Sequence, residues 1–168
     1  MTQKFWASSS AVDTDSTTKL IDVSPPNKDY PHGYALGLID YIIRARYRES
    51  FERSVLIEAG KVYEFTIDLR QVCNLFKAGH RIRLDISNSN FPAFNVNPNT
   101  TEKVGYHTRT VVAHNTIYHD TEHPSHIVLP VVPKSQQGNR RFSYGSYPSY
   151  FPLSLVFSTT ENTTNKTT

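Results

Sequence analysis

Hydrophobic and polar residues alternate with a period of two in several short segments of this chain, most clearly at residues 62–69 and 82–86. The hydrophobic positions of these two segments are Tyr63, Phe65, Ile67, Leu69, Ile82, Leu84 and Ile86. Successive side chains of a β-strand point to opposite faces of the sheet, so this alternation is typical of a strand with one buried and one wet face. Both segments are therefore predicted to be strands of an antiparallel sheet.

Five further segments are predicted to form strands: residues 4–10, 17–23, 39–48, 108–118 and 125–132. Polar and turn-forming residues separate them, and loops are expected at residues 11–16, 29–38 and 95–105. Helical periodicity is almost absent, whereas aromatic and β-branched residues, which favour strands, are common. Short strands with such breaks between them predict an all-β fold, a β-sandwich of two antiparallel sheets.

A length of 168 residues is that of one domain. The strand-like segments end near Pro133, so residues 1–133 are expected to form the domain. Residues 134–157 are expected to be an extension with one edge strand at residues 153–157. The Thr- and Asn-rich residues 158–168 are expected to be a disordered tail.

Composition and charge argue against several classes of function. The net charge is only +3, and acidic residues closely follow the most basic segment, residues 44–48, so no nucleic-acid partner is expected. No apolar run is long enough to span a membrane and the N-terminus lacks a signal-peptide core, so no membrane partner is expected and no compartment is assigned. The single cysteine, Cys73, can form no internal disulfide and is expected to be buried.

Four stretches of the chain, taken in order and at compatible spacing, resemble one known module. The residues that carry the resemblance are Trp6–Ser10 with Asp13–Asp15 and Lys19–Val23; Ile43–Arg48; Gly79–Leu84 with Ser89–Pro92 and Asn97–Thr100; and Tyr118–Asp120 with His123–His126 and Leu129–Val131. Together they resemble the C-terminal domain of X-Pro dipeptidyl-peptidases and of the related cocaine-esterase-like acyl hydrolases. The resemblance runs from about Phe5 to Pro133. The chain departs from the family at Ser16, usually aromatic, and at Ala93, usually basic.

The resemblance implies a galactose-binding-like jelly-roll sandwich that accompanies an α/β-hydrolase catalytic domain without doing its chemistry. The implied function is that of an accessory domain of a serine hydrolase, a dipeptidyl-peptidase or an acyl-ester hydrolase, which supports the catalytic domain and one wall of its substrate cleft. In the family the jelly roll begins before the position that matches Phe5, so the sandwich is expected to be incomplete at its N-terminal side. The implied partner is the catalytic domain, and a homo-oligomer remains open.

No catalytic residue is predicted within this chain. The nucleophilic serine of such hydrolases sits in a G-x-S-x-G turn, and that pattern does not occur here. Ser146 follows Gly145 in a Tyr-, Ser- and Pro-rich context without a following helix, which indicates an ordinary turn. The chain alone is therefore expected to be inactive as a hydrolase and to need no cofactor.

A cluster of histidines raises the question of a metal site. His107, His114, His119, His123 and His126 lie within twenty residues, and the segment from His119 to His123 also contains two carboxylates. Zinc needs three or four converging ligands. The resemblance implies a structural turn in this segment, so no metal site is predicted.

Charged residues in two further places are candidates for contact with the catalytic domain. Asp13 and Asp15 flank a predicted turn, where local Asx-turn capping is the simpler interpretation and a calcium site would need six or more oxygens. The arginines of residues 44–48 alternate with apolar residues and are expected to form one face, either solvated or in contact with another domain. The candidate interdomain contacts are Asp13, Asp15, Arg44, Arg46, Arg48, His119 and His123.

Two alternatives stay open at this point. Jelly rolls often carry sugar-binding sites in which flat aromatic rings stack on the ligand, and Trp6 with the tyrosine-rich residues 143–151 could supply such rings. The chain would then be a free-standing carbohydrate- or ligand-binding module. The other alternative is a gene fragment without an independent role.

Overall fold

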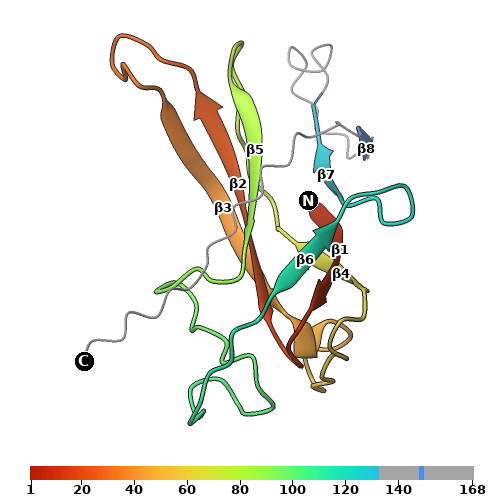
Figure 1. Ribbon diagram of the computed structural model, residues 1–168. Coiled ribbons are helices and arrows are strands. Elements are labelled where there is room, and N and C mark those ends of the chain that lie inside the picture. Colours follow the sequence, from red (N-terminus) through yellow and green to blue (C-terminus); the bar gives the residue numbers. More distant parts are fainter. Residues whose placement is uncertain (133–147, 150–168) are drawn as a thin grey trace, which may run out of the picture.

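A computed structural model describes residues 1–132 and the backbone of residues 148–149. The strands are β1 (Thr2–Ser9), β2 (Asp15–Ser24), β3 (Tyr34–Arg44), β4 (Tyr63–Asp68), β5 (Arg81–Ser87), β6 (Asn115–Tyr118), β7 (His126–Pro130) and β8 (Pro148–Ser149). One short 3-10 turn, η1 (Ala45–Tyr47), follows β3. Two antiparallel sheets face each other and do not close into a barrel (Figure 1). The predicted all-β sandwich is thereby confirmed.

The first sheet is built around β1. Strand β4 pairs with one edge of β1, from Thr2 opposite Asp68 to Ala7 opposite Tyr63. Two short strands share the other edge: β7 pairs with residues 2–4 and β6 with residues 6–9. Strand β8 extends this sheet by pairing with β7. The sheet therefore contains segments from both ends of the described chain.

The second sheet has three strands in the order β3, β2, β5. Leu20 of β2 lies between Ile39 of β3 and Leu84 of β5, and the pairing of β2 with β3 shifts by one residue just after Leu20. Such a bulge bends the strand and increases its twist. Figure 1 shows these three strands running together as a long twisted layer beside the first sheet.

The hydrophobic core lies between the two sheets. Phe5 and Phe65 stack at its centre with their ring centroids 5.2 Å apart, and Leu20 and Leu84 cover them from the other sheet. One hydrogen bond also crosses between the sheets, since the Thr18 hydroxyl donates to Gln3 Oε1 over 2.5 Å. The core residues are Phe5, Ala7, Leu20, Ile43, Ala45, Ile57, Phe65, Ile67, Leu69, Leu84, Ile127 and Leu129. The predicted inward faces of β4 and β5 are thereby confirmed.

Several predicted strand boundaries are wrong. The loop expected at residues 29–38 ends early because β3 begins at Tyr34, where it pairs with the last residue of β2. Strand β3 then ends at Arg44, and not at Arg48, because the backbone turns into η1. The strand expected at residues 108–118 is reduced to β6, because Asn115 already pairs with Ser9, where β1 ends, and residues 108–114 have no β1 residue opposite them.

Cys73 is exposed, which corrects the prediction that it is buried. It lies in the irregular connection between β4 and β5, where Val72 packs against the core while Leu75 is exposed. Residues 153–157, the tail and the side chains of residues 143–151 lie outside the described residues, so the predictions for them remain predictions. In the described part of the chain, no helix has the length and apolar character needed to cross a membrane.

Candidate functional site

A buried ion pair joins the turn between β1 and β2 to the segment that follows β3. The Arg46 guanidinium donates from Nε to Asp13 Oδ2 over 2.7 Å, and the Arg46 backbone amide donates to Asp13 Oδ1 over 2.9 Å. The Asp13 side chain is 0% exposed and that of Arg46 7%. A charge removed from water in this way is stable only when it is paired and hydrogen-bonded. Asp13 and Arg46 meet that condition with each other.

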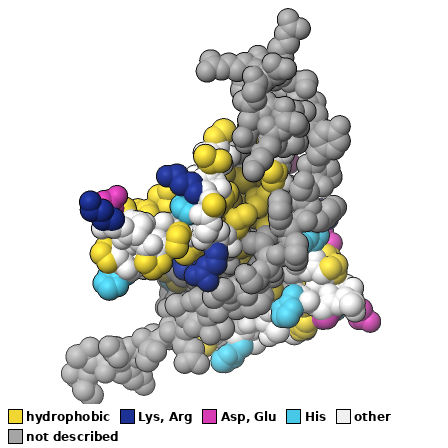
Figure 2. All heavy atoms as spheres, turned by 90° about the horizontal axis from the view of Figure 1, so that it is seen from above, with side chains coloured by type: hydrophobic (Ala, Val, Ile, Leu, Met, Phe, Trp, Pro, Cys, Tyr) yellow, Lys and Arg dark blue, Asp and Glu magenta, His cyan; other side chains and the backbone are white. Residues whose placement is uncertain are grey.

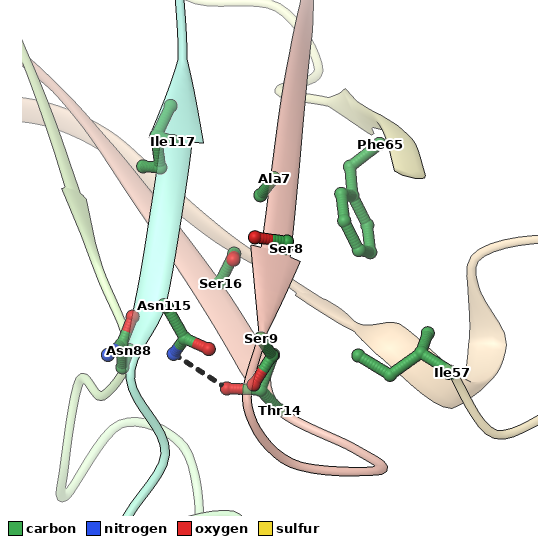
Figure 3. A pocket seen from close by; sticks show the side chains of 10 residues that line it. All are labelled: Ala7, Ser8, Ser9, Thr14, Ser16, Ile57, Phe65, Asn88, Asn115 and Ile117. Atoms are coloured by element: carbon green, nitrogen blue, oxygen red, sulfur yellow. Dashed lines mark hydrogen bonds between the residues drawn. The ribbon is translucent and has the colours of Figure 1, made fainter. Parts of the chain in front are cut away.

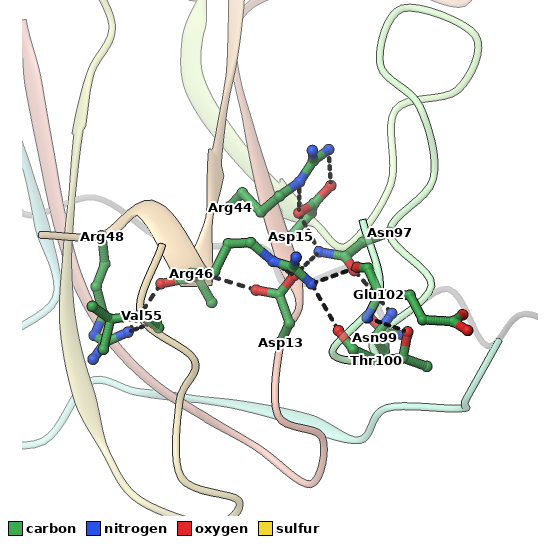
Figure 4. A network of polar contacts seen from close by, with 11 residues as sticks. Asp13, Asp15, Arg44, Arg46, Arg48, Val55, Asn97, Asn99, Thr100 and Glu102 are labelled. Carbon is green, nitrogen blue, oxygen red and sulfur yellow. Dashed lines mark hydrogen bonds and ion pairs between the residues drawn. The ribbon is translucent and has the colours of Figure 1, made fainter. Parts of the chain in front are cut away.

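A second ion pair lies beside the first (Figure 4). Arg44 donates from Nε and Nη2 to the two oxygens of Asp15, over 2.9 Å and 3.1 Å. The Asn97 side-chain amide links both pairs, because its Nδ2 donates to Asp13 Oδ2 over 2.8 Å and to Asp15 Oδ1 over 2.7 Å. We call these five residues, Asp13, Asp15, Arg44, Arg46 and Asn97, the carboxylate–guanidinium network.

Burial and ion pairing have opposite effects on the pKa values of Asp15 and Arg44. Burial raises the pKa of Asp15 above its usual value, although the hydrogen bonds from Arg44 and Asn97 favour the carboxylate. Burial also disfavours the Arg44 cation, but its hydrogen bond and its attraction to Asp15 outweigh this and raise the pKa of Arg44. The bidentate geometry indicates a charged pair that has given up much of its hydration.

The network fixes two loops at this end of the sandwich. Arg46 Nη2 donates to the backbone carbonyls of Thr100, over 2.7 Å, and Glu102, over 3.0 Å. The neighbouring Arg48 donates to the carbonyl of Val55 over 2.6 Å, and the Val55 amide donates to the Arg46 carbonyl over 2.7 Å. The connection from β5 to β6 and the segment after η1 are therefore both tied to the β1–β2 turn, as Figure 4 shows.

These contacts correct two interpretations of the sequence. Arg44, Arg46 and Arg48 do not form one solvated face, because η1 turns the chain between them and the guanidinium groups bind different internal partners. The carboxylates of Asp13 and Asp15 bind guanidinium groups and Asn97, in place of the predicted Asx-turn capping.

Sequence reasoning missed Asn97, which lies in a polar loop and is buried. The only signal for it was its place in the Asn97–Thr100 stretch that resembles the family.

The histidine segment forms a separate cluster on the first sheet. His123 Nδ1 lies 3.0 Å from Asp120 Oδ1, and its ring lies near those of Trp6 and Tyr118, with centroids 6.4 Å and 5.3 Å away. Hydrogen bonds from the backbone and side chain of His123 oppose the effect of burial and lower the pKa of Asp120. His119 is exposed. In residues 1–132, no group of three or more His, Cys, Asp or Glu side chains is placed to hold a metal ion.

Another buried carboxylate lies near the opposite end of the sandwich and was also missed. Asp22 of β2 has Asn74 Nδ2 at 3.0 Å and His80 Nδ1 at 2.7 Å on its two oxygens. Both partners come from the connection between β4 and β5. Asp22 therefore attaches that connection to the second sheet.

A small cavity opens between the sheets beside β1 and β6 (Figure 3). Its interior offers about 10 Å³ to the centre of a water molecule, which is room for about one water and none for a substrate. Asn115 donates to Thr14 Oγ1 over 3.0 Å there, while its Oδ1 is buried and accepts no hydrogen bond in the described part of the chain. The cavity therefore suits a bound water and does not resemble an active site.

Comparison with known proteins identifies a similar domain. Residues 1–128 match a family model described as the X-Pro dipeptidyl-peptidase C-terminal non-catalytic domain. The cocaine esterase of Rhodococcus sp. (strain MB1 Bresler) is 45% identical to this chain over 131 residues, which are 77% of this chain and 22% of the esterase.

Two solved structures share the fold. An aminopeptidase from a marine sediment Thaumarchaeota archaeon matches with a TM-score of 0.67 and 32% identity, and an α-amino acid ester hydrolase with a TM-score of 0.69 and 31% identity. Each match covers 74% of this chain and 21% of the other chain. The chain thus spans about a fifth of the length of these relatives.

Proposed function

This chain belongs to the family of X-Pro dipeptidyl-peptidase C-terminal non-catalytic domains, and from that membership we propose that it supports the catalytic domain of an α/β serine hydrolase. The substrate class would be esters or peptides, the two kinds of bond that the names of its relatives suggest. Hydrolysis would take place on the catalytic domain, and this chain would buttress that domain and shape one side of its substrate cleft.

One observation carries the proposal. A domain described as non-catalytic matches three quarters of this chain, while the same region makes up only 21–22% of three relatives whose names are those of hydrolases. The remainder of each relative is large enough to hold a catalytic domain. The carboxylate–guanidinium network fits a supporting role, because it fixes loops and leaves no reactive group exposed at its centre.

The candidate interdomain contacts divide into two groups by their burial. The buried group is Asp13, Asp15, Arg46 and Arg48, whose side chains are at most 8% exposed and bind partners within the chain. We propose that these four residues act by holding loops in place. Arg44 is about one quarter exposed, and His119 and His123 lie on the surface of the β6–β7 connection, so these three are open to direct contact. The partner we propose is the catalytic domain; a homo-oligomer is not required.

Complementation of a truncated relative tests the proposal. The Rhodococcus cocaine esterase would be produced without the 131 residues that match this chain, and its ester hydrolysis measured with and without the added chain. We expect the chain to bind the truncated esterase and to raise its activity. Arg46→Met serves as a control that damages the network, and Lys4→Met as a control on an exposed ion pair. A chain that is folded but neither binds nor stimulates the truncated esterase would refute the proposal.

A further inference from the structure

We propose that the long connection between β5 and β6, residues 88–114, is the surface with which this chain docks on the catalytic domain. This inference rests on the proposed function and adds the place of contact. The connection has 27 residues without a strand or helix. Loops of this length within a compact domain are uncommon and are usually either functional or disordered linkers.

The loop exposes large hydrophobic side chains. Phe91, Tyr106 and Val112 are 70%, 86% and 69% exposed, and Val96 and Val111 are exposed as well. Each such side chain in water forgoes the free energy that burial would give, about 25 cal/mol for every Å² of apolar surface. Several of them on one loop mark a surface that another molecule covers.

The loop is fixed although its hydrophobic side chains are exposed. Asn97 at its base is bound to both buried carboxylates, and Arg46 holds the carbonyls of Thr100 and Glu102. The two arms of the loop are joined where the Val111 amide donates to the Pro98 carbonyl over 3.0 Å and Asn99 Nδ2 donates to the Val111 carbonyl over 2.8 Å. A loop held in this way loses little conformational entropy on binding, which favours docking.

The charge of the loop indicates a protein partner. Only Glu102, Lys103 and Arg109 are charged among its 27 residues. Nucleic acid would require a basic surface, whereas the cores of protein interfaces are poor in charge and rich in aromatic residues. The relatives are about five times as long as the matched region, so in those three chains the matched region has the rest of a hydrolase as its covalent neighbour.

Hydrophobic residues are also exposed at the opposite end of the sandwich, where β2 ends and β3 begins. Figure 2 views this end and shows hydrophobic side chains gathered on it. Tyr34 and Leu36 of β3 are 47% and 42% exposed there, and Leu75 of the β4–β5 connection is 71% exposed. This end therefore supplies a matched control.

The test measures the affinity of the full chain for the truncated Rhodococcus cocaine esterase by titration calorimetry. The loop variant is Tyr106→Ser with Val112→Ser, and the control is Tyr34→Ser with Leu36→Ser, so each removes one tyrosine and one aliphatic side chain. Circular dichroism and thermal unfolding check that each variant is folded. Tyr106→Ser alone serves if the loop variant does not fold, because Tyr106 is 86% exposed.

We expect the loop variant to bind at least about tenfold more weakly, as for the loss of an interface anchor, and the control to bind as the unchanged chain does. Equal binding of the loop variant, or weakening by the control variant alone, would overturn the inference and leave the proposed function standing. Failure of the unchanged chain to bind would overturn both. A further outcome is that the unchanged chain forms a dimer, whereas the loop variant is a monomer that binds the truncated esterase as tightly as before. That outcome would assign the loop to contact with a second copy of this chain and would also overturn the inference.

Discussion

Arg46 binds Asp13 twice, through its backbone amide and through its guanidinium, at 2.9 Å and 2.7 Å. The two residues are 33 positions apart and both are buried. The same guanidinium also holds two carbonyls of the loop between β5 and β6. One arginine thus connects the β1–β2 turn to the loop that we propose as the docking surface.

Arg46→Met should destabilise the protein by about 3–5 kcal/mol, because it leaves the Asp13 carboxylate buried without its partner. Lys4→Met is the matched control, since it removes one partner of an exposed ion pair with Glu64 and should cost about 0–1 kcal/mol. Urea unfolding of both variants measures the difference. A loss below about 1 kcal/mol in Arg46→Met would mean that the buried pair does not hold this end of the sandwich.

Thr18→Val should cost about 1–3 kcal/mol, because it leaves Gln3 Oε1 without its donor between the sheets. The double variant Thr18→Val with Gln3→Leu removes both polar groups and should recover part of this loss. A double-mutant cycle on the free energy of unfolding gives the coupling between the two residues. Strictly additive effects would show that the hydrogen bond between the sheets contributes nothing.

Acid should loosen the docking loop. The hydrogen bonds that Thr108 donates, first from its hydroxyl and then from its backbone amide, lower the pKa of Glu102 below 4.5. A lowered pKa means that the folded protein holds the ionised form more strongly, so this stabilisation is present above pH 4.5 and is lost as the pH falls through the folded-state pKa. Glu102→Gln should therefore have a lower free energy of unfolding than the unchanged chain at neutral pH. Urea unfolding at a series of pH values should show this difference disappear in acid. A difference that does not change with pH would contradict the assignment.

The purified chain should show no hydrolase activity of its own. No G-x-S-x-G turn is present in the sequence, and the family it belongs to is described as non-catalytic. Incubation with a fluorophosphonate and with ester substrates provides the measurement. Stoichiometric labelling of one serine, together with turnover that the reagent abolishes, would contradict the account.

The sequence predicted the parts of the fold that depend on local alternation. Phe65, Ile67 and Leu84 were placed on the inward face, and they are buried in the core. The ends of strands were harder to predict, because they depend on partners far along the chain. Strand β6 begins only at Asn115 because its partner β1 ends at Ser9, and no local pattern contains that information.

The network was the largest gap in the sequence-based account. Asp13 and Arg46 are both candidates from the sequence, but a polar turn around Asp13 and the alternating segment around Arg46 both favour a surface position. Their pairing depends on η1, which turns Arg46 inward, and on a loop that delivers Asn97 from 84 residues away. Charged residues are almost never fully buried unless they are paired, so sequence patterns favour exposure until the partner is known.

The most direct test of the central claim is hydrogen–deuterium exchange of this chain, alone and bound to the Rhodococcus cocaine esterase that lacks the matched 131 residues. The account predicts that binding slows exchange at residues 104–112 of the β5–β6 loop and leaves residues 30–36, at the other end of the sandwich, unchanged. Protection confined to residues 30–36, or no change anywhere in the chain on mixing, would contradict it.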